Sequence, residues 1–537
     1  MQAGVLRSEI VDEIVRGEQF DAVIVGSGIA GLRAAVELSE SGASVAVLTK
    51  DSPIESNTGE AQGGIAVALS EEDRIEFHLQ DTLRAGDGLC DEAAVRVLVE
   101  EGPLRIQELI DWGTCFDRDG ARLAFAREGA HSRRRVLHAH GDSTGREIVR
   151  ALLARVSTFP SIAFLSRTFS VDLVLLGDRC VGLLVLDESS GALRILSAGA
   201  LMLATGGAGR LYRETTNPPQ ATGDGVALAY RAGAPVTDLE FVQFHPTTLF
   251  APGAPRFLLS EALRGEGALL TNGRGERFMS RYHPDAELAP RDAVSRAIVL
   301  EMERTGEPCM YLDLTGRDPA AVRKRFPRIY ETCLRFGFDL ARQPIPIHPS
   351  AHYFMGGVRT DLDGRSALRG LYAAGEVACT GVHGANRLTS NSLLEGLVFG
   401  ARAGAAMKKE ILTPPSRAFL ASPPGAPSPA EAEALTRGLG AVMGSLVGIR
   451  RSREKLLRAL DAIGTLKSSL GSAPATRPGL EARNLILLGE LVARAALERE
   501  ESRGAHFRSD FPSRRDVWAR RIESRAPTPA PDLPRAI

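Results

Sequence analysis

The amino-acid sequence predicts an α/β fold built on a parallel sheet, with an inserted α+β segment and a C-terminal helical bundle. Three observations support this prediction. A strand, glycine turn, helix and second strand follow one another near the start of the chain, and a second apolar strand ends much later in Gly375-Glu376. Apolar stripes with helical spacing then occupy the C-terminal part. At 537 residues the chain is too long for one simple core, so roughly two to four domains are expected.

The first unit is a βαβ motif. Residues 20–25 are an apolar strand, Gly26-Ser27-Gly28-Ile29-Ala30-Gly31 forms the turn, residues 32–39 continue as a helix, and residues 45–48 form the next strand. In this context a G-x-G-x-x-G motif allows a tight turn and lets the backbone approach a pyrophosphate closely. A tight turn in an unliganded sheet is the alternative. The motif therefore predicts a Rossmann-like dinucleotide-binding domain.

One feature of a simple NAD site is missing. The second strand ends in Thr49-Lys50, where an Asp or Glu would bind the ribose. Glu376, after the late strand, can supply a carboxylate to the cofactor from another part of the chain. A plain NAD dehydrogenase is therefore disfavoured.

Another glycine-rich cluster lies between these two strands. Residues 201–207 resemble a strand entering a glycine turn, and Ala221-Thr222-Gly223-Asp224-Gly225 opens a helix that continues to about residue 232. Asp224 either caps this helix or contacts the cofactor, and the pattern leaves both roles open.

The late strand leads into a polar loop and a helix. The loop carries His383-Gly384-Ala385-Asn386-Arg387, and Ser390-Asn391 is expected to cap the helix that follows. A strand end, a polar loop and a helix N-terminus together favour binding of an anion or cofactor. We expect both ends of the chain to hold one cofactor.

These elements predict five segments. Residues 1–238 and 354–412 form the two parts of the cofactor-binding domain, and residues 239–353 are inserted as a capping and substrate domain. The Pro-, Ser- and Ala-rich residues 413–429 are a linker, and residues 430–537 form a domain of about three helices. The Pro-rich tail from Ala526 is expected to be disordered.

Composition excludes several classes of protein. The net charge is −1, so nothing attracts the chain to nucleic acid or an acidic membrane. Six scattered cysteines without C-x-x-C spacing argue against a zinc or iron–sulfur site. The basic triplet Arg133-Arg134-Arg135 is too short to indicate nucleic-acid or membrane binding, and a solvated face or an anionic substrate channel is favoured instead. With no signal peptide visible in residues 1–19 and no long apolar run, the chain is expected to be cytoplasmic.

Four motifs now resemble one known family. They are Gly26-Ser27-Gly28-Ile29-Ala30-Gly31, Ala61-Gln62-Gly63-Gly64-Ile65, His383-Gly384-Ala385-Asn386-Arg387 and Glu501-Ser502-Arg503-Gly504-Ala505-His506. They resemble the succinate dehydrogenase/fumarate reductase flavoprotein family, in the family's order and across nearly the whole chain. Within it, Arg127-Glu128-Gly129 and Ser390-Asn391-Ser392 are most similar to the L-aspartate oxidases.

The resemblance implies one FAD per chain. The implied cofactor residues are Ser27, Gly28, Ile29, Ala30, Gly31, Lys50, Asn57, Thr58, Gly59, Glu60, Ala61, Gln62, Gly63, Gly64, Asp224, Glu376, Ser392 and Leu393. Residues 27–31 would hold the pyrophosphate, and residues 57–64 would wrap the isoalloxazine and ribityl chain. Members with covalently linked flavin carry a His at the position of Asn57, so the FAD is expected to be noncovalent.

The resemblance also implies a dicarboxylate substrate. Arg387, His245 and His352 are the candidates for binding its carboxylates, with Gln243 and the hydroxyl of Ser260 in support. A lone histidine is otherwise more often structural. Arg291 resembles the family's proton-transfer arginine, and the alternative is an arginine at a helix start paired with an acidic residue. No metal is implied.

Glu128 is the residue that discriminates between substrates. An amino acid carries an ammonium that succinate lacks, and a carboxylate beside it offsets its desolvation. The resemblance places Glu128 in this role, and a surface charge in a loop is the alternative.

The reaction implied is oxidation of L-aspartate to iminoaspartate, with hydride transfer from the α-carbon to flavin N5. Oxygen or fumarate would accept the electrons, quinolinate synthase would consume the imine, and the reaction would begin quinolinate and NAD biosynthesis. A flavoprotein subunit of succinate dehydrogenase or fumarate reductase is the near alternative, which Asn57 and Glu128 disfavour. A soluble fumarate reductase and a nucleotide-binding regulatory protein are the others.

Overall fold

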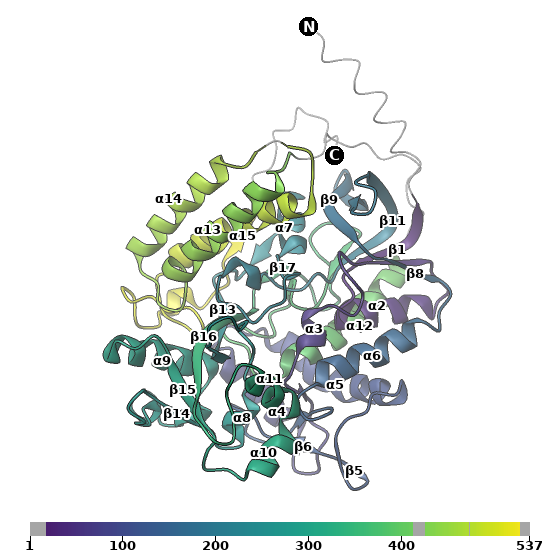
Figure 1. The fold of residues 1–537 in the computed structure, drawn as a ribbon. Coiled ribbons are helices and arrows are strands. Elements are labelled where there is room, and N and C mark those ends of the chain that lie inside the picture. The colour runs from purple at the N-terminus through teal and green to yellow at the C-terminus, as the bar shows by residue number, and fades with distance from the viewer. Residues whose placement is uncertain (1–17, 412–424, 472, 527–537) are drawn as a thin grey trace.

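A central sheet made of segments from both ends of the chain organises the structure. The computed structural model describes residues 18–411, 425–471 and 473–526 (Figure 1). Predictions for residues 1–17, for 413–424 of the linker and for the tail after residue 526 lie outside these ranges. Among the described residues, no helix is long and apolar enough to cross a membrane.

The predicted βαβ unit is present. Strand β1 (Gln19–Val25) leads through the glycine turn into helix α2 (Ile29–Ser39), and β2 (Val45–Leu48) follows. β1 and β2 pair in parallel, and both have buried apolar side chains on their two faces. Near-continuous apolar strands are typical of a parallel sheet covered on both sides.

The seven-stranded sheet has the order β8-β2-β1-β11-β10-β9, with β18 pairing β11. β8 (Ile162–Leu165), β2, β1, β11 (Leu193–Leu203) and β18 (Leu371–Ala373) are parallel. β9 (Thr168–Leu176) and β10 (Arg179–Asp187) extend it as an antiparallel hairpin. The late strand β18 thus joins the first strands through β11, which confirms the α/β prediction.

Helix α12 (Asn391–Glu410) packs directly on α2 through small residues. A Cβ added at Gly400 would lie 2.6 Å from the Ala30 carbonyl oxygen, and one at Gly396 would lie 2.6 Å from Ile29 Cγ2. Only glycine allows this close approach of the two helices. The N-termini of α2 and α12 therefore meet at the same end of the sheet, where a shared cofactor would lie.

Other elements cover this core. The helices are α3 (Asn57–Glu60), α4 (Ile75–Ala85), α5 (Glu92–Asp111), α6 (Thr144–Val156) and α7 (Asp224–Arg231). The short strands are β3 (Ile65–Ala66), β4 (Arg118–Asp119), β5 (Arg122–Leu123), β6 (Phe125–Ala126), β7 (Val136–Leu137), β12 (Val236–Thr237), β17 (Gly357–Arg359), β19 (Ala378–Cys379) and β20 (Glu523–Ser524).

A second sheet lies within the segment predicted to be inserted. β13 (Val242–Leu249), β16 (Ile345–Phe354), β15 (Met310–Asp313) and β14 (Leu269–Thr271) form it, all antiparallel. The helices are α8 (Ala262–Gly265), α9 (Arg291–Thr305), α10 (Pro319–Arg325) and α11 (Pro327–Arg335). They surround a separate apolar core in the lower left of Figure 1. The segment is α+β, and its exact boundaries stay a prediction.

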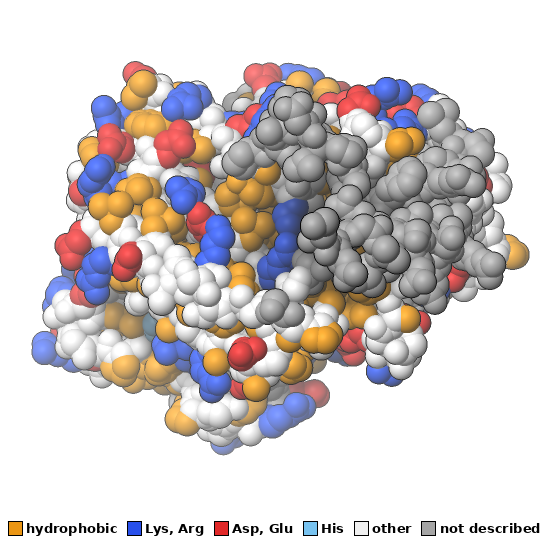
Figure 2. All heavy atoms as spheres, turned by 90° about the horizontal axis from the view of Figure 1, so that it is seen from above, with side chains coloured by type: hydrophobic (Ala, Val, Ile, Leu, Met, Phe, Trp, Pro, Cys, Tyr) orange, Lys and Arg blue, Asp and Glu red, His pale blue; other side chains and the backbone are white. Residues whose placement is uncertain are grey.

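Three α-helices lie within residues 425–471 and 473–526. They are α13 (Pro429–Leu446), α14 (Arg453–Ser468) and α15 (Arg477–Glu498), which pack on one another and, through α15, on α7 (Figure 1). Pro429, the last residue of the predicted linker, is already the first residue of α13, because Ser428 and Glu431 form a capping box there. Charges of both signs alternate over the face shown in Figure 2, in keeping with the balanced composition.

Candidate active site

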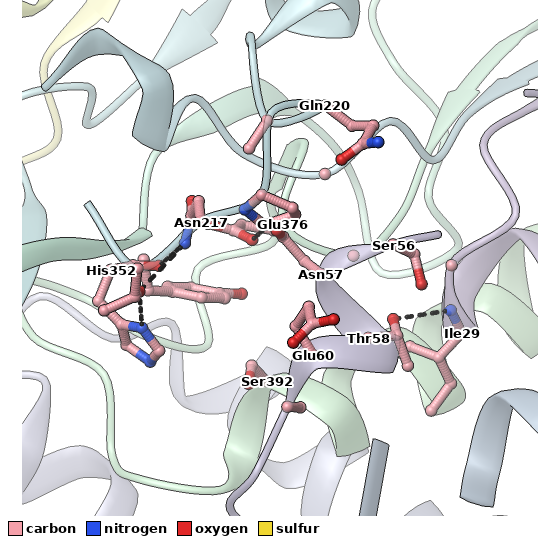
Figure 3. A pocket seen from close by; sticks show the side chains of 18 of the residues that line it. Ile29, Ser56, Asn57, Thr58, Glu60, Asn217, Gln220, His352, Glu376 and Ser392 are labelled. Atoms are coloured by element: carbon pink, nitrogen blue, oxygen red, sulfur yellow. Dashed lines mark hydrogen bonds between the residues drawn. The ribbon is translucent and has the colours of Figure 1, made fainter. Parts of the chain in front are cut away.

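A cavity of about 810 Å³ lies where α2, α3, α12 and the inserted segment meet. Figure 3 shows its wall, with Asn57, Thr58 and Glu60 on α3 and with Glu376, His352 and Ser392 from later segments. Most residues predicted for the cofactor and substrate line it. They are Ser27, Gly28, Ile29, Ala30, Lys50, Asn57, Thr58, Glu60, Ala61, Gln62, Gly63, Gly64, Glu128, Asp224, His245, Ser260, Arg291, His352, Glu376, Arg387, Ser392 and Leu393.

Gly31, Gly59 and Gln243 are not among the lining residues. Gly31 instead allows close packing within the turn, because a Cβ there would lie 2.0 Å from the Gly26 carbonyl oxygen. Gly59 lies in α3, and its N–H donates to Ser56 Oγ at 3.2 Å. These two glycines lie behind the residues that line the cavity. A direct contact of either glycine with the cofactor stays a prediction.

The cofactor part of the cavity presents buried polar atoms that have no partner among the described residues. Asn57 Oδ1, Gln62 Oε1 and Thr205 Oγ1 are of this kind, and all three residues line the cavity. Burying polar atoms without a hydrogen bond is costly, so such atoms mark the places where a polar ligand binds. Together with the glycine turn at the N-terminus of α2, they fit a dinucleotide.

Lys50 and Asp224 form an ion pair at the end of β2. Lys50 Nζ lies 2.8 Å from Asp224 Oδ2 and 2.7 Å from Glu481 Oε1 on α15. Asp224 is the first residue of α7 and makes no cap; its other oxygen accepts from Asn484 Nδ2 at 2.8 Å. The capping alternative is therefore wrong. Two carboxylates, those of Asp224 and Glu481, thus lie beside Lys50 at the end of β2.

Asn57 and Glu376 contact each other across the cavity. Asn57 Nδ2 donates to Glu376 Oε2 at 3.2 Å, and the Phe354 N–H donates to Glu376 Oε1 at 3.0 Å. Burial raises the pKa of Glu376 to about 7, although the Phe354 bond and the Arg387 charge oppose it. Glu376 thus changes charge near neutral pH while facing the cofactor space.

This raised pKa makes the stability of the apoprotein depend on pH. Folded Glu376 keeps its proton up to about pH 7, whereas an unfolded Glu releases it near its usual value of 4.5. The contribution of Glu376 to the slope of stability against pH is therefore negative, a fall of a few kcal/mol between about pH 4.5 and 7, and the buried histidines, whose pKa burial lowers, contribute with the opposite sign. In urea unfolding at several pH values, Glu376→Gln should remove part of that slope. Burial and the charge of Glu240 also raise the pKa of Asp238 to about 7, so Asp238 should contribute to the slope with the same sign as Glu376. An unchanged slope in Glu376→Gln would contradict the assignment.

The start of α12 differs from the predicted cap. Ser390 is the N-cap residue in a left-handed conformation (φ 64°), but its side chain makes no cap bond. Its hydroxyl donates instead to Glu128 Oε2 at 2.7 Å. The first turn of α12, with Ser392 and Leu393, remains turned toward the cavity, where a helix N-terminus favours negative charge.

Two arginines form the cationic centre of the site. Arg291 Nη1 and Arg387 Nη2 each donate to Gln243 Oε1 at 3.0 Å. Gln243 is fully buried and thereby holds the two guanidinium groups side by side. Burial and the charge of Arg291 lower the pKa of Arg387 to about 10, which still leaves it charged at neutral pH. Gln243 is thus a spacer between the two guanidinium groups.

Glu261, which also lines the cavity, and Arg264 extend this centre. Glu261 Oε2 lies 2.5 Å from Arg291 Nε, and Glu261 Oε1 lies 3.1 Å from Arg264 Nη2. Burial alone would raise the pKa of Glu261, but the charges of Arg264 and Arg291 lower it. The alternative for Arg291, an arginine at a helix start paired with an acidic residue, is therefore present in the structure. Arg291 also lines the cavity.

His245 and His352 face each other with ring centroids 5.2 Å apart. Burial, followed by the charge of Arg291, lowers the pKa of each well below its usual range, so both are neutral at pH 7. His352 Nδ1 lies 2.8 Å from Thr216 Oγ1, and His245 Nδ1 lies 3.1 Å from the Thr247 carbonyl oxygen. His245 Nε2 is buried and has no hydrogen-bond partner among the described residues, so it is available to a ligand in the cavity.

Glu128 is a buried carboxylate that also lines the cavity. Its side chain has no exposed surface, and its Oε1 lies 3.3 Å from His138 Nε2. Burial alone would raise the pKa of Glu128, but the bonds from His138 and Ser390 bring it to about 2. A surface charge in a loop is therefore excluded. The cavity thus has a buried negative charge in its lining as well as its two arginines.

Comparisons with known proteins agree with this geometry. Residues 21–393 match the family described as FAD binding domain, and residues 436–525 match fumarate reductase flavoprotein C-term. L-aspartate oxidase 1 of Ralstonia nicotianae is 46% identical over 92% of this chain and 96% of its own. The chain belongs to the L-aspartate oxidase family. Its cofactor is FAD.

Relatives in this family are found in bacteria and plants. L-aspartate oxidase of Pseudomonas aeruginosa is 43% identical over 92% of this chain and 96% of its own, and the chloroplastic enzyme of Oryza sativa is 44% identical over 92% and 82%. Among solved structures, a variant of E. coli quinol fumarate reductase FrdA has a TM-score of 0.87 and 32% identity, covering 95% of each chain. The fold is thus shared with flavoproteins outside the L-aspartate oxidase family.

Several residues that line the cavity were not predicted as site residues from the sequence. Thr205, Glu261, Tyr353 and Ser390 are among them. Tyr353 lies with its ring 4.3 Å from the Arg387 guanidinium carbon and donates to Glu395 Oε2 at 2.9 Å. Glu261 had one sequence signal, since Glu261 and Arg264 interrupt an otherwise apolar stretch beside Ser260.

Proposed function

We propose that this chain catalyses the FAD-dependent oxidation of L-aspartate to iminoaspartate. The observation that carries the proposal is the buried Glu128 carboxylate in the cavity that also holds Arg291 and Arg387. Three arginines, with Arg264 included, against Glu128 and Glu261 leave one positive charge. L-aspartate carries two carboxylates and one ammonium, so it complements both the net charge and its distribution. Succinate would leave Glu128 facing no cation.

The carboxylates of the substrate would bind at the cationic wall. Arg387 and Arg291 supply charge, and the neutral histidines 245 and 352 supply N–H donors at Nε2. Either tautomer of His245 finds a backbone partner, because its Nδ1 also lies 3.3 Å from the Thr247 N–H. Ser260 Oγ accepts from the Ala262 N–H at 3.3 Å, which leaves its own proton free to donate.

The chemistry that the bound FAD supplies is acceptance of the hydride from the α-carbon. The nitrogen loses one proton for each hydride that leaves the carbon. With a pKa of about 2, Glu128 is too weak a base to keep that proton, so it acts as the counter-charge that fixes the ammonium. Binding at both ends orients the α-hydrogen.

Fumarate as electron acceptor would need a proton as well as a hydride. Arg291 is the group we assign to it, because Glu261 and the buried Arg264 continue from Arg291 as a chain of charged groups. Oxygen as acceptor needs no such donor on the substrate side. Both acceptors therefore fit the site, and the flavoprotein-subunit alternative is disfavoured by the family assignment.

The wider role follows from the product. Iminoaspartate hydrolyses readily, so an enzyme that uses it, quinolinate synthase in NAD biosynthesis, would act in the same compartment, for which we propose the cytoplasm. The inserted segment, proposed as residues 239–353, carries His245, Ser260 and Arg291 and would close over the substrate. Residues 1–238 and 354–412 would form the FAD-binding domain.

We propose that the FAD, one per chain, is noncovalent. Asn57 lies at the position of the linking histidine. Its amide nitrogen is no nucleophile, because the lone pair is delocalised into the carbonyl, and this nitrogen donates to Glu376. Acid precipitation of the purified protein should leave all the flavin absorbance in the supernatant. Yellow colour that stays with the pellet would contradict this.

Oxygen consumption tests the function directly. Air-saturated protein given L-aspartate should consume oxygen and form oxaloacetate as the imine hydrolyses, whereas D-aspartate and L-alanine should give little, because one mispositions the ammonium and the other lacks the second carboxylate. Activity with L-alanine equal to that with L-aspartate would remove the arginine pair from carboxylate binding.

A further inference from the structure

His138 contacts Glu128 from outside the cavity. It follows β7 directly and is 3% exposed, and its Nε2 lies 3.3 Å from Glu128 Oε1. Among the described residues that line the cavity, Glu128 is present and His138 is not. A substrate in the cavity therefore touches Glu128 but not His138, so any effect of His138 on the reaction passes through Glu128.

The direction of the hydrogen bonds follows from charge. An ionised carboxylate only accepts, so His138 Nε2 must carry the hydrogen in the bond to Oε1. The Ser390 hydroxyl donates to Oε2 at 2.7 Å. Each oxygen thus has one donor from the chain, from segments far apart in sequence. These two bonds fix the plane of the carboxylate and leave lone pairs for a further donor.

L-aspartate, succinate and fumarate interact differently with the Glu128 carboxylate. The ammonium of L-aspartate donates N–H groups and carries a positive charge, whereas succinate and fumarate present only C–H groups at that position. A carboxylate that is ionised and held in one orientation binds the first and gains nothing from the others. The orientation of Glu128 is therefore a determinant of substrate choice.

We propose that His138 is a positioning residue that holds the Glu128 carboxylate toward the substrate's amino group and so selects an amino dicarboxylate over a plain one. The inference rests on the proposed function, and it concerns a residue that contacts Glu128 from outside the cavity lining. Without the His138 donor, Oε1 would be a buried acceptor lacking its chain partner. The carboxylate would then turn or take up a proton, and the ammonium would lose its counter-charge.

The test compares two ligands on the FAD-loaded protein. His138→Leu removes the donor, and His138→Gln keeps an N–H near the same place. We expect the KM for L-aspartate to rise roughly tenfold to a hundredfold in His138→Leu, with partial recovery in His138→Gln. The dissociation constant of succinate, measured by its perturbation of the flavin spectrum, should change by less than about twofold.

His140 provides a matched control. It lies two residues further on, has a side chain 63% exposed, and its Nε2 is 3.6 Å from Glu147 rather than Glu128. His140→Gln should leave both constants unchanged. Equal loss of aspartate and succinate binding in His138→Leu, or no change in the aspartate KM, would overturn the proposal. If the unaltered protein binds succinate but does not oxidise L-aspartate, the proposed function itself fails, which the wild-type measurement shows independently.

Discussion

Glu128→Gln should lower kcat/KM for L-aspartate by at least about a hundredfold while fumarate reduction by the reduced protein changes little. The carboxylate is fully buried, so the glutamine would leave the substrate ammonium in a water-poor site without a counter-charge, which costs roughly 2–5 kcal/mol. Fumarate has no ammonium and loses nothing comparable. Steady-state oxidation and fumarate reduction, measured on one preparation, give the two values.

The control for this change is Asp119→Asn. Asp119 is an exposed carboxylate in the β4–β5 hairpin, close in sequence to Glu128 but outside the cavity lining. Its loss should affect neither reaction. If Glu128→Gln weakens both reactions equally, Glu128 does not recognise the ammonium.

Arg387→Lys should produce the complementary result, a loss of roughly a hundredfold to a thousandfold with L-aspartate and succinate alike. Arg387 donates to Ser392 Oγ at 2.9 Å and to Gln243 Oε1 at 3.0 Å, and its planar group lies over the Tyr353 ring. A lysine keeps the charge but has one nitrogen, so it cannot keep both bonds and bind a carboxylate through a fork. Aspartate kcat/KM and succinate affinity report the loss.

FAD content must be measured in the same samples. Arg437→Lys, on the exposed surface of α13, is a control for arginine replacement in general. Full FAD content with weak binding of both ligands supports the role of Arg387. Succinate affinity at the wild-type level would show that Arg387 does not hold a carboxylate.

The local parts of the fold could be predicted from sequence because their signals are local. The turn at residues 26–31 and strand β2 at Val45–Leu48 follow from glycine spacing and apolar runs within a few residues. The same holds for the motifs that place Asn57, His352 and Arg387 on the cavity wall, which their resemblance to a family indicated.

Side-chain partners from distant segments could not be predicted in this way. Ser390 was expected to cap α12, but packing brings it to Glu128, 262 positions away. Arg135, part of a basic triplet that suggested a solvated face or a channel, is fully buried and pairs with Asp73 at 2.8 Å and with Asp81 at 2.5 Å. Such pairs depend on tertiary packing, which composition and spacing do not encode.

The most direct measurement is anaerobic. The purified protein, freed of oxygen, is mixed with L-aspartate or with succinate while the visible absorbance of the flavin is followed. We expect rapid bleaching by L-aspartate, reversal when air is admitted, and no comparable bleaching by succinate. Bleaching by succinate without bleaching by L-aspartate would contradict this expectation and would remove Glu128 from its proposed role.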